Sequence, residues 1–176
     1  MKDLHRDTLA VRAGINRSHW GETSEGLFLN SGFSYPDGET AEARFDGSEP
    51  GFVYSRYGNP TMEAFTQRML AMEPGAEACM ATASGMSSVF GALASYLNAG
   101  DHVVASKALF GSCWQILANI LPRWGIESTL VDGGDLQAWK AALKPNTRAA
   151  FLETPSNPLL SLVDIQAVSD LVHYNR

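Results

Sequence analysis

HVVAS (residues 102–106), SCWQILANILPRW (112–124) and IESTLV (126–131) follow one another with only short connections between them. The first and third segments are short apolar runs with several β-branched residues, which predicts strands. The middle segment has the length of a helix. A strand, a helix and a second strand in this order predict two parallel strands joined by a helical crossover.

The same alternation continues on both sides of this unit. Helices are expected at residues 61–72, 85–97, 136–143 and 164–176, and further strands at residues 77–82 and 148–152. Helix 85–97 is apolar nearly all round, which predicts burial between the sheet and a partner. Short connections between alternating strands and helices predict an α/β fold, in which a mostly parallel sheet is flanked by helices on both faces.

Residues 1–59 differ from the rest in composition. They are rich in Gly, Ser, Asn and acidic residues, with only short regular pieces near residues 8–13 and 27–33. This composition fits an arm that lies on another surface better than a self-contained domain. We therefore expect an arm over residues 1–59 and the first part of a larger domain over residues 60–176. That domain is expected to be truncated, because the last helix has no stop signal and few strands are present.

Composition and charge exclude several classes of protein. With 45% hydrophobic and 18% charged residues, the 176-residue chain is expected to be globular. A net charge of -6 without a basic run argues against nucleic-acid binding. No apolar run spans a membrane and no signal-peptide core is present, so a cytoplasmic location is expected. Cys79 and Cys113 have neither disulfide nor zinc spacing, so no metal is expected, and Cys113 is expected to be a small buried residue.

The segment YSRYGNPT (residues 54–61) ends the arm. Asn59 is a good N-cap, and Pro60 suits the first position of the helix that follows. Tyr54 and Arg56 therefore lie on an extended stretch just before a helix, where a guanidinium beside a phenol can bind a phosphate. An isolated Tyr-x-Arg would more often be a surface turn.

Three loops follow the expected strands at the edge where open parallel sheets bind ligands. In the first loop, Ser84 caps a helix whose free Gly85 and Met86 amides can bind an anion. A plain capped helix has the same sequence, so this phosphate signal is weak by itself. The usual nucleotide motifs GxGxxG and GxxxxGK[ST] are absent.

The other two loops add an aromatic ring and a carboxamide. Phe110, before a glycine, can place a flat face over a ligand, although such a Phe is usually part of a core. Asn157 is held extended by Pro158 and can donate to a ring oxygen or a carboxylate, unless the loop is only a rigid connector. Lys107 fits a solvated lysine better than a nucleophile. Together with the arm, these loops predict a site for a flat, phosphorylated ring cofactor.

Several motifs resemble, in the same order, the pyridoxal-phosphate enzymes of sulfur amino-acid metabolism, the cystathionine synthase/lyase family. The matching motifs are TLAVRAG (residues 8–14), YSRYGNPT (54–61), ASGM (83–86), FG (110–111) and ETPSNP (153–158). The resemblance covers nearly the whole chain. It implies fold type I of the pyridoxal-phosphate enzymes, which is like that of aspartate aminotransferase.

The resemblance also implies roles for individual residues. Gly85 and Met86 would bind the phosphate of pyridoxal 5'-phosphate (PLP) through backbone amides. Phe110 would stack on the pyridine ring, and Asn157 would hydrogen-bond the phenolic oxygen of that ring. Tyr54 and Arg56 would reach the phosphate in the neighbouring subunit of a homotetramer that is a dimer of dimers.

Within the family, the chain most resembles the sulfhydrylase branch, which makes homocysteine from O-succinylhomoserine and sulfide in methionine biosynthesis. Many relatives have Tyr-Gly-Gly-Thr where this chain has residues 110–113, and the missing phenol favours a sulfhydrylase over a lyase. The family's Schiff-base lysine lies beyond Arg176, and no lysine of this chain stands in the matching context. No catalytic residue is therefore assigned, and residues 1–176 alone are expected to be inactive.

Three alternatives remain open at this stage. Within the same class, the activity could be that of a cystathionine γ-synthase or γ-lyase. A non-catalytic nucleotide-binding module of Rossmann type would need a glycine-rich first turn, which is absent. An assembly partner without chemistry is the third alternative.

Overall fold

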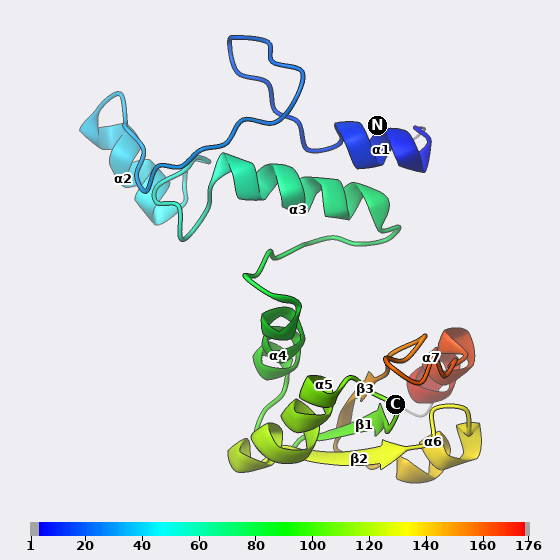
Figure 1. Cartoon of the computed structure of the whole chain (residues 1–176). Coiled ribbons are helices and arrows are strands. Elements are labelled where there is room, and N and C mark those ends of the chain that lie inside the picture. Colours follow the sequence, from blue (N-terminus) through cyan, green and yellow to red (C-terminus); the bar gives the residue numbers. More distant parts are fainter. Residues whose placement is uncertain (1–3, 175–176) are drawn as a thin grey trace. The chain divides into compact units, whose positions relative to one another are not determined.

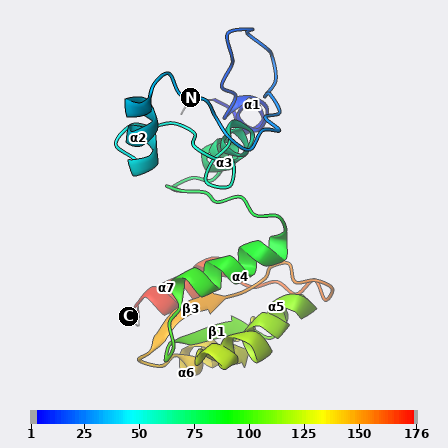
Figure 2. The same cartoon turned by 90° about the vertical axis from the view of Figure 1, so that its left-hand side faces the viewer.

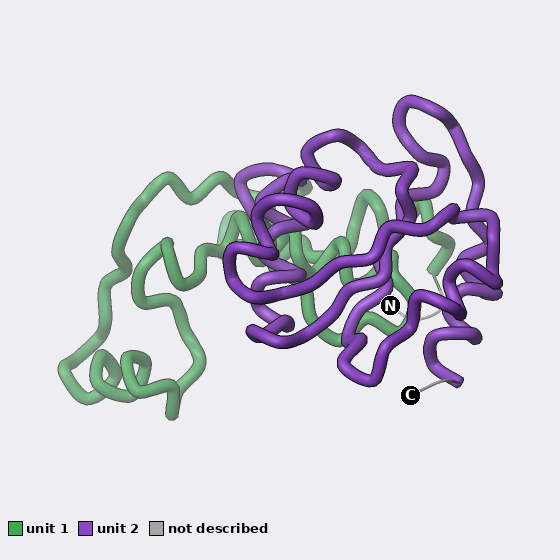
Figure 3. Tube along the Cα trace, turned by 90° about the horizontal axis from the view of Figure 1, so that it is seen from below, with its two compact units in different colours: residues 1–81 green, residues 82–176 purple. Residues whose placement is uncertain are grey.

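The computed structural model describes residues 4–174 of the chain (Figure 1). The chain divides into two compact units, residues 1–81 and residues 82–176, which we call unit 1 and unit 2 (Figure 3). The division falls after Ala81, whereas the expected boundary between arm and large domain falls after Asn59. The difference arises because the helix that follows Asn59 packs on the first helix of the chain.

The described part of unit 2 has a sheet of three parallel strands, which correspond to three of the four strands that the sequence predicted. They are β1 (His102–Ser106), β2 (Glu127–Val131) and β3 (Thr147–Phe151), in the order β2-β1-β3. All five residues of the central strand β1 are buried. Strand β1 is therefore covered on both faces, which explains why it reads as a continuous apolar run.

Helices cover both faces of this sheet. Helix α4 (Gly85–Tyr96) precedes β1, and the crossover to β2 consists of α5 (Gly111–Gln115), the π-helical segment η1 (Ile116–Ile120) and the 3-10 segment η2 (Leu121–Trp124). Helix α6 (Leu136–Ala142) joins β2 to β3, and α7 (Ile165–Tyr174) follows β3. Figure 2 shows α4 and α5 on one side of the sheet. The expected extension of α7 to Arg176 lies outside the described residues.

Two apolar clusters hold the helices to the sheet. On one face, Val103 and Ala105 of β1 pack with buried residues of α4, α5 and η1. On the other face, Val104 packs with Trp139 of α6 and Val168 of α7. Trp139 is completely buried, and its Nε1 donates to the carbonyl of Gly133 at 3.1 Å. The alternation of side chains along β1 thus supplies both cores.

A buried histidine joins all three strands near their amino ends. Nδ1 of His102 lies 2.8 Å from Oγ1 of Thr147 on β3, and its Nε2 lies 2.8 Å from Oγ1 of Thr129 on β2. Burial lowers the pKa of His102, and the positive charge of Lys144 acts in the same direction. The neutral ring, with one nitrogen donating and the other accepting, therefore fits this position.

From residue 4 onward, unit 1 consists of three helices and long irregular segments. They are α1 (Arg6–Arg12), α2 (Gly38–Asp46) and α3 (Pro60–Met72). The N-cap that the sequence predicted for α3 is confirmed, because Oδ1 of Asn59 accepts from the amide of Thr61 at 2.9 Å. Helix α2 was not predicted, although Asp37 caps its first turn and Gly47 ends it in the left-handed conformation.

Helix α3 is held to the end of α1 by a glycine contact and a hydrogen bond, and to a later segment by an ion pair. Gly14, which has a φ of +77°, lies so close to α3 that a Cβ atom on it would be 2.1 Å from the carbonyl oxygen of Ala64. Arg68 of α3 donates to the carbonyl of Ala13 and forms two hydrogen bonds with the carboxylate of Glu25. This close packing explains why a glycine stands at position 14 of the TLAVRAG motif.

One predicted strand is wrong. Residues 77–82 form no strand, and the structure gives them no regular secondary structure. Met80 is 82% exposed, and no strand of the described chain lies beside this segment to satisfy its backbone groups. Strand-like composition is not enough without a pairing partner.

Candidate cofactor site

The predicted site residues of unit 2 lie on loops that surround the carboxyl ends of β1 and β3. Phe110 follows β1, and Asn157 follows β3. Gly85 and Met86 form the first turn of α4, whose Met86 packs against the cluster that contains Leu109 and Cys113. The fold therefore brings residues that are far apart in the sequence to one end of unit 2.

The start of α4 is organised by hydroxyl groups. Oγ of Ser84 accepts from the amide of Ser87 at 3.2 Å, and Oγ1 of Thr82 donates to the carbonyl of Ser84 at 2.8 Å. Ser84 is the predicted N-cap. The amides of Gly85 and Met86 have no acceptor within the helix, and nothing in the described chain lies within 4 Å of a Cβ built on Gly85. This turn can accept an anion.

Phe110 and Asn157 are joined by Glu153, which sequence reasoning placed in a motif but gave no role. The amide of Phe110 donates to Oε2 of Glu153 at 2.8 Å, and the amide of Asn157 donates to Oε1 at 2.6 Å. Only the position of a carboxylate at the end of a strand could have indicated this role. The two loops are thus fixed relative to each other by one side chain.

Both side chains that the site would offer to a ring remain available. Phe110 is 44% exposed. The carboxamide of Asn157 makes no hydrogen bond to any residue between 4 and 174, and Asn157 is exposed. An exposed aromatic face, a free carboxamide and an anion-binding turn fit the pyridine ring, phenolic oxygen and phosphate of PLP.

Two other polar groups near the strand ends have ordinary roles. Cys113 is buried as expected, and burial together with the negative charge of Glu153 raises the pKa of its thiol. It is therefore poorly suited to act as a thiolate. Lys107 forms an exposed ion pair with Asp132, with Nζ and Oδ2 separated by 3.1 Å. This agrees with the interpretation of Lys107 as a surface lysine.

The predicted phosphate clamp lies in unit 1, on the segment that Asn59 organises. The guanidinium carbon of Arg56 lies 5.4 Å from the ring centre of Tyr54 and 5.2 Å from that of Tyr57. Nδ2 of Asn59 donates to Oγ of Ser55 at 2.9 Å. Tyr54 is 42% exposed and Arg56 is also exposed. The clamp residues therefore lie side by side on the surface of unit 1.

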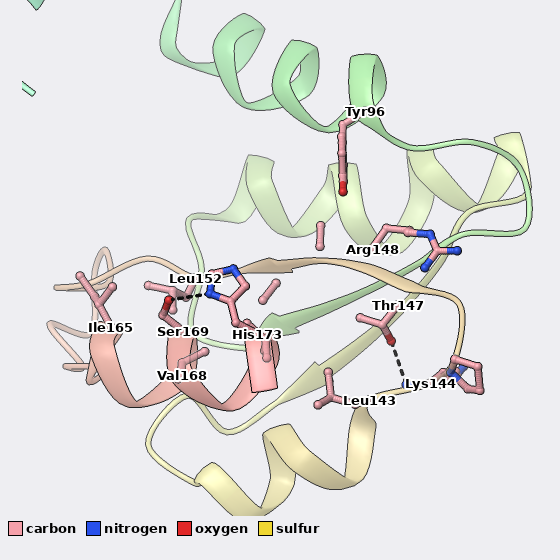
Figure 4. Close-up of a pocket in the computed structure, with 14 residues that line it drawn as sticks. Tyr96, Leu143, Lys144, Thr147, Arg148, Leu152, Ile165, Val168, Ser169 and His173 are labelled. Carbon is pink, nitrogen blue, oxygen red and sulfur yellow. Dashed lines mark hydrogen bonds between the residues drawn. The ribbon is translucent and has the colours of Figure 1, made fainter. Parts of the chain in front are cut away.

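Figure 4 shows a separate cavity of about 780 Å³ in unit 2, between β3, α7 and the end of α4. It is lined by Tyr96, Leu152, Val168 and other mostly apolar residues, and Ser169 and His173 form a hydrogen bond at its wall. None of the predicted site residues lines it. The candidate cofactor site is therefore not this cavity.

The chain is similar to sulfur amino-acid enzymes over almost its entire length. It is 51% identical to O-succinylhomoserine sulfhydrylase of Mycobacterium tuberculosis and 47% identical to that of Pseudomonas aeruginosa, over 94% and 95% of this chain. It is 40% identical to L-methionine gamma-lyase of Fusobacterium nucleatum subsp. polymorphum over 96%. The chain spans 41–42% of the length of these relatives.

Solved structures show the same fold. A Campylobacter jejuni protein described as an O-acetylhomoserine (thiol)-lyase superposes with a TM-score of 0.90 at 30% identity, covering 98% of this chain and 42% of that one. Its structure contains N'-pyridoxyl-lysine-5'-monophosphate. Cystathionine gamma-lyase of Lactobacillus plantarum, in complex with L-serine, gives 0.84 at 31% identity, covering 97% and 42%. The α/β fold is that of the fold type I PLP-dependent enzymes.

The family model for Cys/Met metabolism PLP-dependent enzymes matches residues 7–176. The chain belongs to this family, whose cofactor is PLP. The predicted family resemblance and cofactor are thus confirmed. Among residues 4–174, no helix has the length and apolar character needed to cross a membrane, and no three His, Cys, Asp or Glu side chains are grouped for a metal ion.

Proposed function

We propose that the chain contributes the phosphate- and ring-binding part of a PLP-dependent enzyme that replaces the succinyloxy group of O-succinylhomoserine with the sulfur of sulfide, which releases succinate and gives homocysteine. The observation that carries this proposal is the 51% and 47% identity to two O-succinylhomoserine sulfhydrylases, together with a site whose free groups match PLP. PLP, when bound, supplies an electron sink for reactions of amino acids.

The residues of this chain bind and orient the cofactor. The amides of Gly85 and Met86 hold its phosphate at the positive end of α4, an N-terminus with no acidic residue in its first turn. The ring of Phe110 covers one face of the pyridine ring and excludes water from it. The carboxamide of Asn157 would donate a hydrogen bond to the phenolic oxygen of the cofactor.

The arm completes the site of a neighbouring copy. Tyr54 and Arg56 place a hydroxyl and a guanidinium on an exposed surface, where they can bind the cofactor phosphate of a second subunit. The proposed assembly is a homotetramer built as two dimers, each with two shared sites. Residues 1–59 then act as an arm on the neighbouring subunit, and residues 60–176 as part of the large PLP-binding domain.

Residues 1–176 alone are proposed to be inactive. Two lysines lie near strand ends and form ion pairs, Lys107 with Asp132 and Lys144 with Glu127. Neither stands in the sequence context of the family's PLP-bearing lysine. Without such an amine the polypeptide cannot anchor PLP covalently or move protons for it. Turnover by residues 1–176 alone would contradict this statement.

A chimera tests the function. Residues 1–176 are joined to the C-terminal remainder of the M. tuberculosis relative, and homocysteine formation is measured with O-succinylhomoserine and sulfide. We expect PLP-dependent turnover, and about tenfold weaker PLP binding in Asn157→Ala, which loses a hydrogen bond to a charged oxygen. Asn119→Ala removes an exposed Asn from the crossover helix and serves as the control. A folded chimera that binds no PLP would contradict the proposal.

The second candidate is elimination or cystathionine chemistry, which the L-methionine gamma-lyase and cystathionine gamma-lyase relatives favour. The same chimera discriminates. Faster reaction with cysteine than with sulfide would indicate a cystathionine γ-synthase. Release of a keto acid without added thiol would indicate a lyase.

A further inference from the structure

Glu153 occupies an unusual position in unit 2. It lies two residues beyond the end of β3 and is half-buried. Its two carboxylate oxygens accept from two different backbone segments, the amides of Phe110 and Asn157, at 2.8 and 2.6 Å. The first of these bonds joins residues that are 43 positions apart in the sequence. Glu153 is thus the direct link between the two loops.

The side chains of Phe110 and Asn157 have few restraints of their own, although the backbone beside Asn157 is also held by the buried Ser156, whose hydroxyl oxygen accepts from the amide of Ser161. Phe110 stands at the N-cap of α5, but its side chain cannot cap the helix and makes no capping hydrogen bond. Asn157 is exposed, and its carboxamide has no partner between residues 4 and 174. Both bonds to Glu153 are made by the main chain. The carboxylate therefore fixes the backbone at Phe110 and at Asn157. The position of that backbone then sets where the ring of Phe110 and the carboxamide of Asn157 lie.

We propose that Glu153 is a positioning residue that holds the ring-stacking Phe110 and the oxygen-binding Asn157 at a fixed separation around PLP. This inference rests on the proposed function, because it assumes that PLP lies between these loops. Glu153 acts only through the two amides. Hydrogen bonds to a carboxylate are among the stronger ones in proteins, so the separation is well defined before the cofactor binds.

The chemistry of the side chain predicts how substitutions differ. Glutamine has one carbonyl oxygen, so Glu153→Gln keeps an acceptor for only one of the two amides. Glu153→Ala keeps none. Glu153→Asp keeps both oxygens on a side chain that is shorter by one methylene, so it restores the charge without the full reach.

The experiment uses the chimera, with PLP as the probe. The PLP dissociation constant, the absorption maximum of bound PLP and the pH at which that absorption titrates are measured for the three variants, alongside the urea midpoint of unfolding. We expect about tenfold weaker PLP binding in Glu153→Gln, a larger loss in Glu153→Ala and an intermediate value in Glu153→Asp. The absorption of bound PLP should shift most in Glu153→Ala, because the amide of Asn157 then loses its acceptor and the bond from Asn157 to the phenolic oxygen is displaced.

Glu127→Gln is the matched control. Glu127 is an exposed carboxylate at the start of β2 that pairs with Lys144, so it belongs to the same unit but to the opposite end of the strands. Its replacement should leave the affinity and absorption of PLP unchanged. A purely structural role of Glu153 would instead lower the urea midpoint without moving the absorption of bound PLP.

A double-mutant cycle tests whether Glu153 acts through Asn157. If it does, Glu153→Gln should weaken PLP binding much less in the Asn157→Ala background than in the parent. Additive losses, or an unchanged absorption in all Glu153 variants, would overturn the inference while leaving the proposed function intact. If the unsubstituted folded chimera binds no PLP, the proposed function fails and the inference fails with it.

Discussion

Unit 1 and unit 2 are built from similar lengths of chain but bury very different amounts of apolar surface. In unit 2, two clusters on opposite faces of the sheet contain fully buried residues such as Val104, Leu117 and Trp139. In unit 1, the buried apolar residues of the described chain are Ala13 and Ala64. The difference shows that good helix signals do not make a core, since α3 forms as predicted while most of its apolar residues stay exposed.

The same contrast applies to the site. The residues proposed to hold PLP in unit 2 lie at the start of α4 and on the loops after β1 and β3, whereas Tyr54 and Arg56 lie on a unit that exposes large apolar side chains. The most exposed of these are Trp20, Leu29, Tyr57 and Met80. Surfaces of this kind mark sites of interaction. This contrast supports the proposal that unit 1 packs against a neighbouring subunit.

The largest expected effect comes from removing the buried indole of unit 2. Trp139→Ala deletes a completely buried side chain and its hydrogen bond to Gly133, and should lower the free energy of unfolding by about 3–5 kcal/mol. In unit 1, Phe65 is 52% exposed, so Phe65→Ala should change it by no more than about 0.5 kcal/mol. Urea unfolding of each variant measures both values. Equal losses would show that unit 1 has a core of its own.

A smaller effect is expected at the contact that holds unit 1 together. Gly14→Ala adds a Cβ against the carbonyl oxygen of Ala64 and strains a left-handed residue, at a cost of about 2 kcal/mol. Hydrogen exchange should speed up in α1 and α3 but not in β1. Gly47→Ala is the control, since its φ is +81° but nothing lies within 4 Å of the new Cβ. If both substitutions have the same effect, the α1–α3 contact contributes nothing beyond backbone strain.

The smallest effect is expected from pH, because it depends on a single proton. Burial and Lys144 lower the pKa of His102 from its ordinary value of 6.5, while Glu127 opposes them. Below pH 6.5 the unfolded chain binds a proton that the folded chain excludes. The free energy of unfolding of unit 2 should therefore decrease as the pH falls below 6.5, and the contribution of His102 should be fully present above 6.5. Urea midpoints between pH 5 and 8 measure this. In His102→Gln this part of the pH dependence should disappear, and its persistence would assign the dependence to other groups.

Much of unit 2 could be predicted from the sequence, because its elements alternate and its strands are apolar. The predicted strand at residues 77–82 was wrong because strand formation depends on a neighbouring strand, which a local pattern does not contain. Helix α2 was missed because most of its residues are polar or charged, although Asp37 and Gly47 mark its two ends. The mixed α, π and 3-10 character of residues 111–124 likewise depends on packing rather than on composition.

The candidate site was predictable in its parts but not in how they are joined. Gly85, Phe110 and Asn157 each follow a local rule about helix starts, aromatic residues or prolines, and the family resemblance joined them. Glu153 follows no such rule. Its proposed importance comes from the combination of a local hydrogen bond to the amide of Asn157 with one to the amide of Phe110, and the second bond requires that β1 and β3 pair and bring the two loops together.

The central claim is that PLP lies at the carboxyl end of the unit 2 sheet, and a crystal structure of the PLP-bound chimera tests it most directly. We predict that the phosphate lies within hydrogen-bond distance of the Gly85 and Met86 amides, with Phe110 stacked on the ring and Asn157 bonded to its phenolic oxygen. Tyr54 and Arg56 of the neighbouring subunit should contact the same phosphate. A cofactor bound away from the start of α4, or a ring that Phe110 and Asn157 do not touch, would contradict the account.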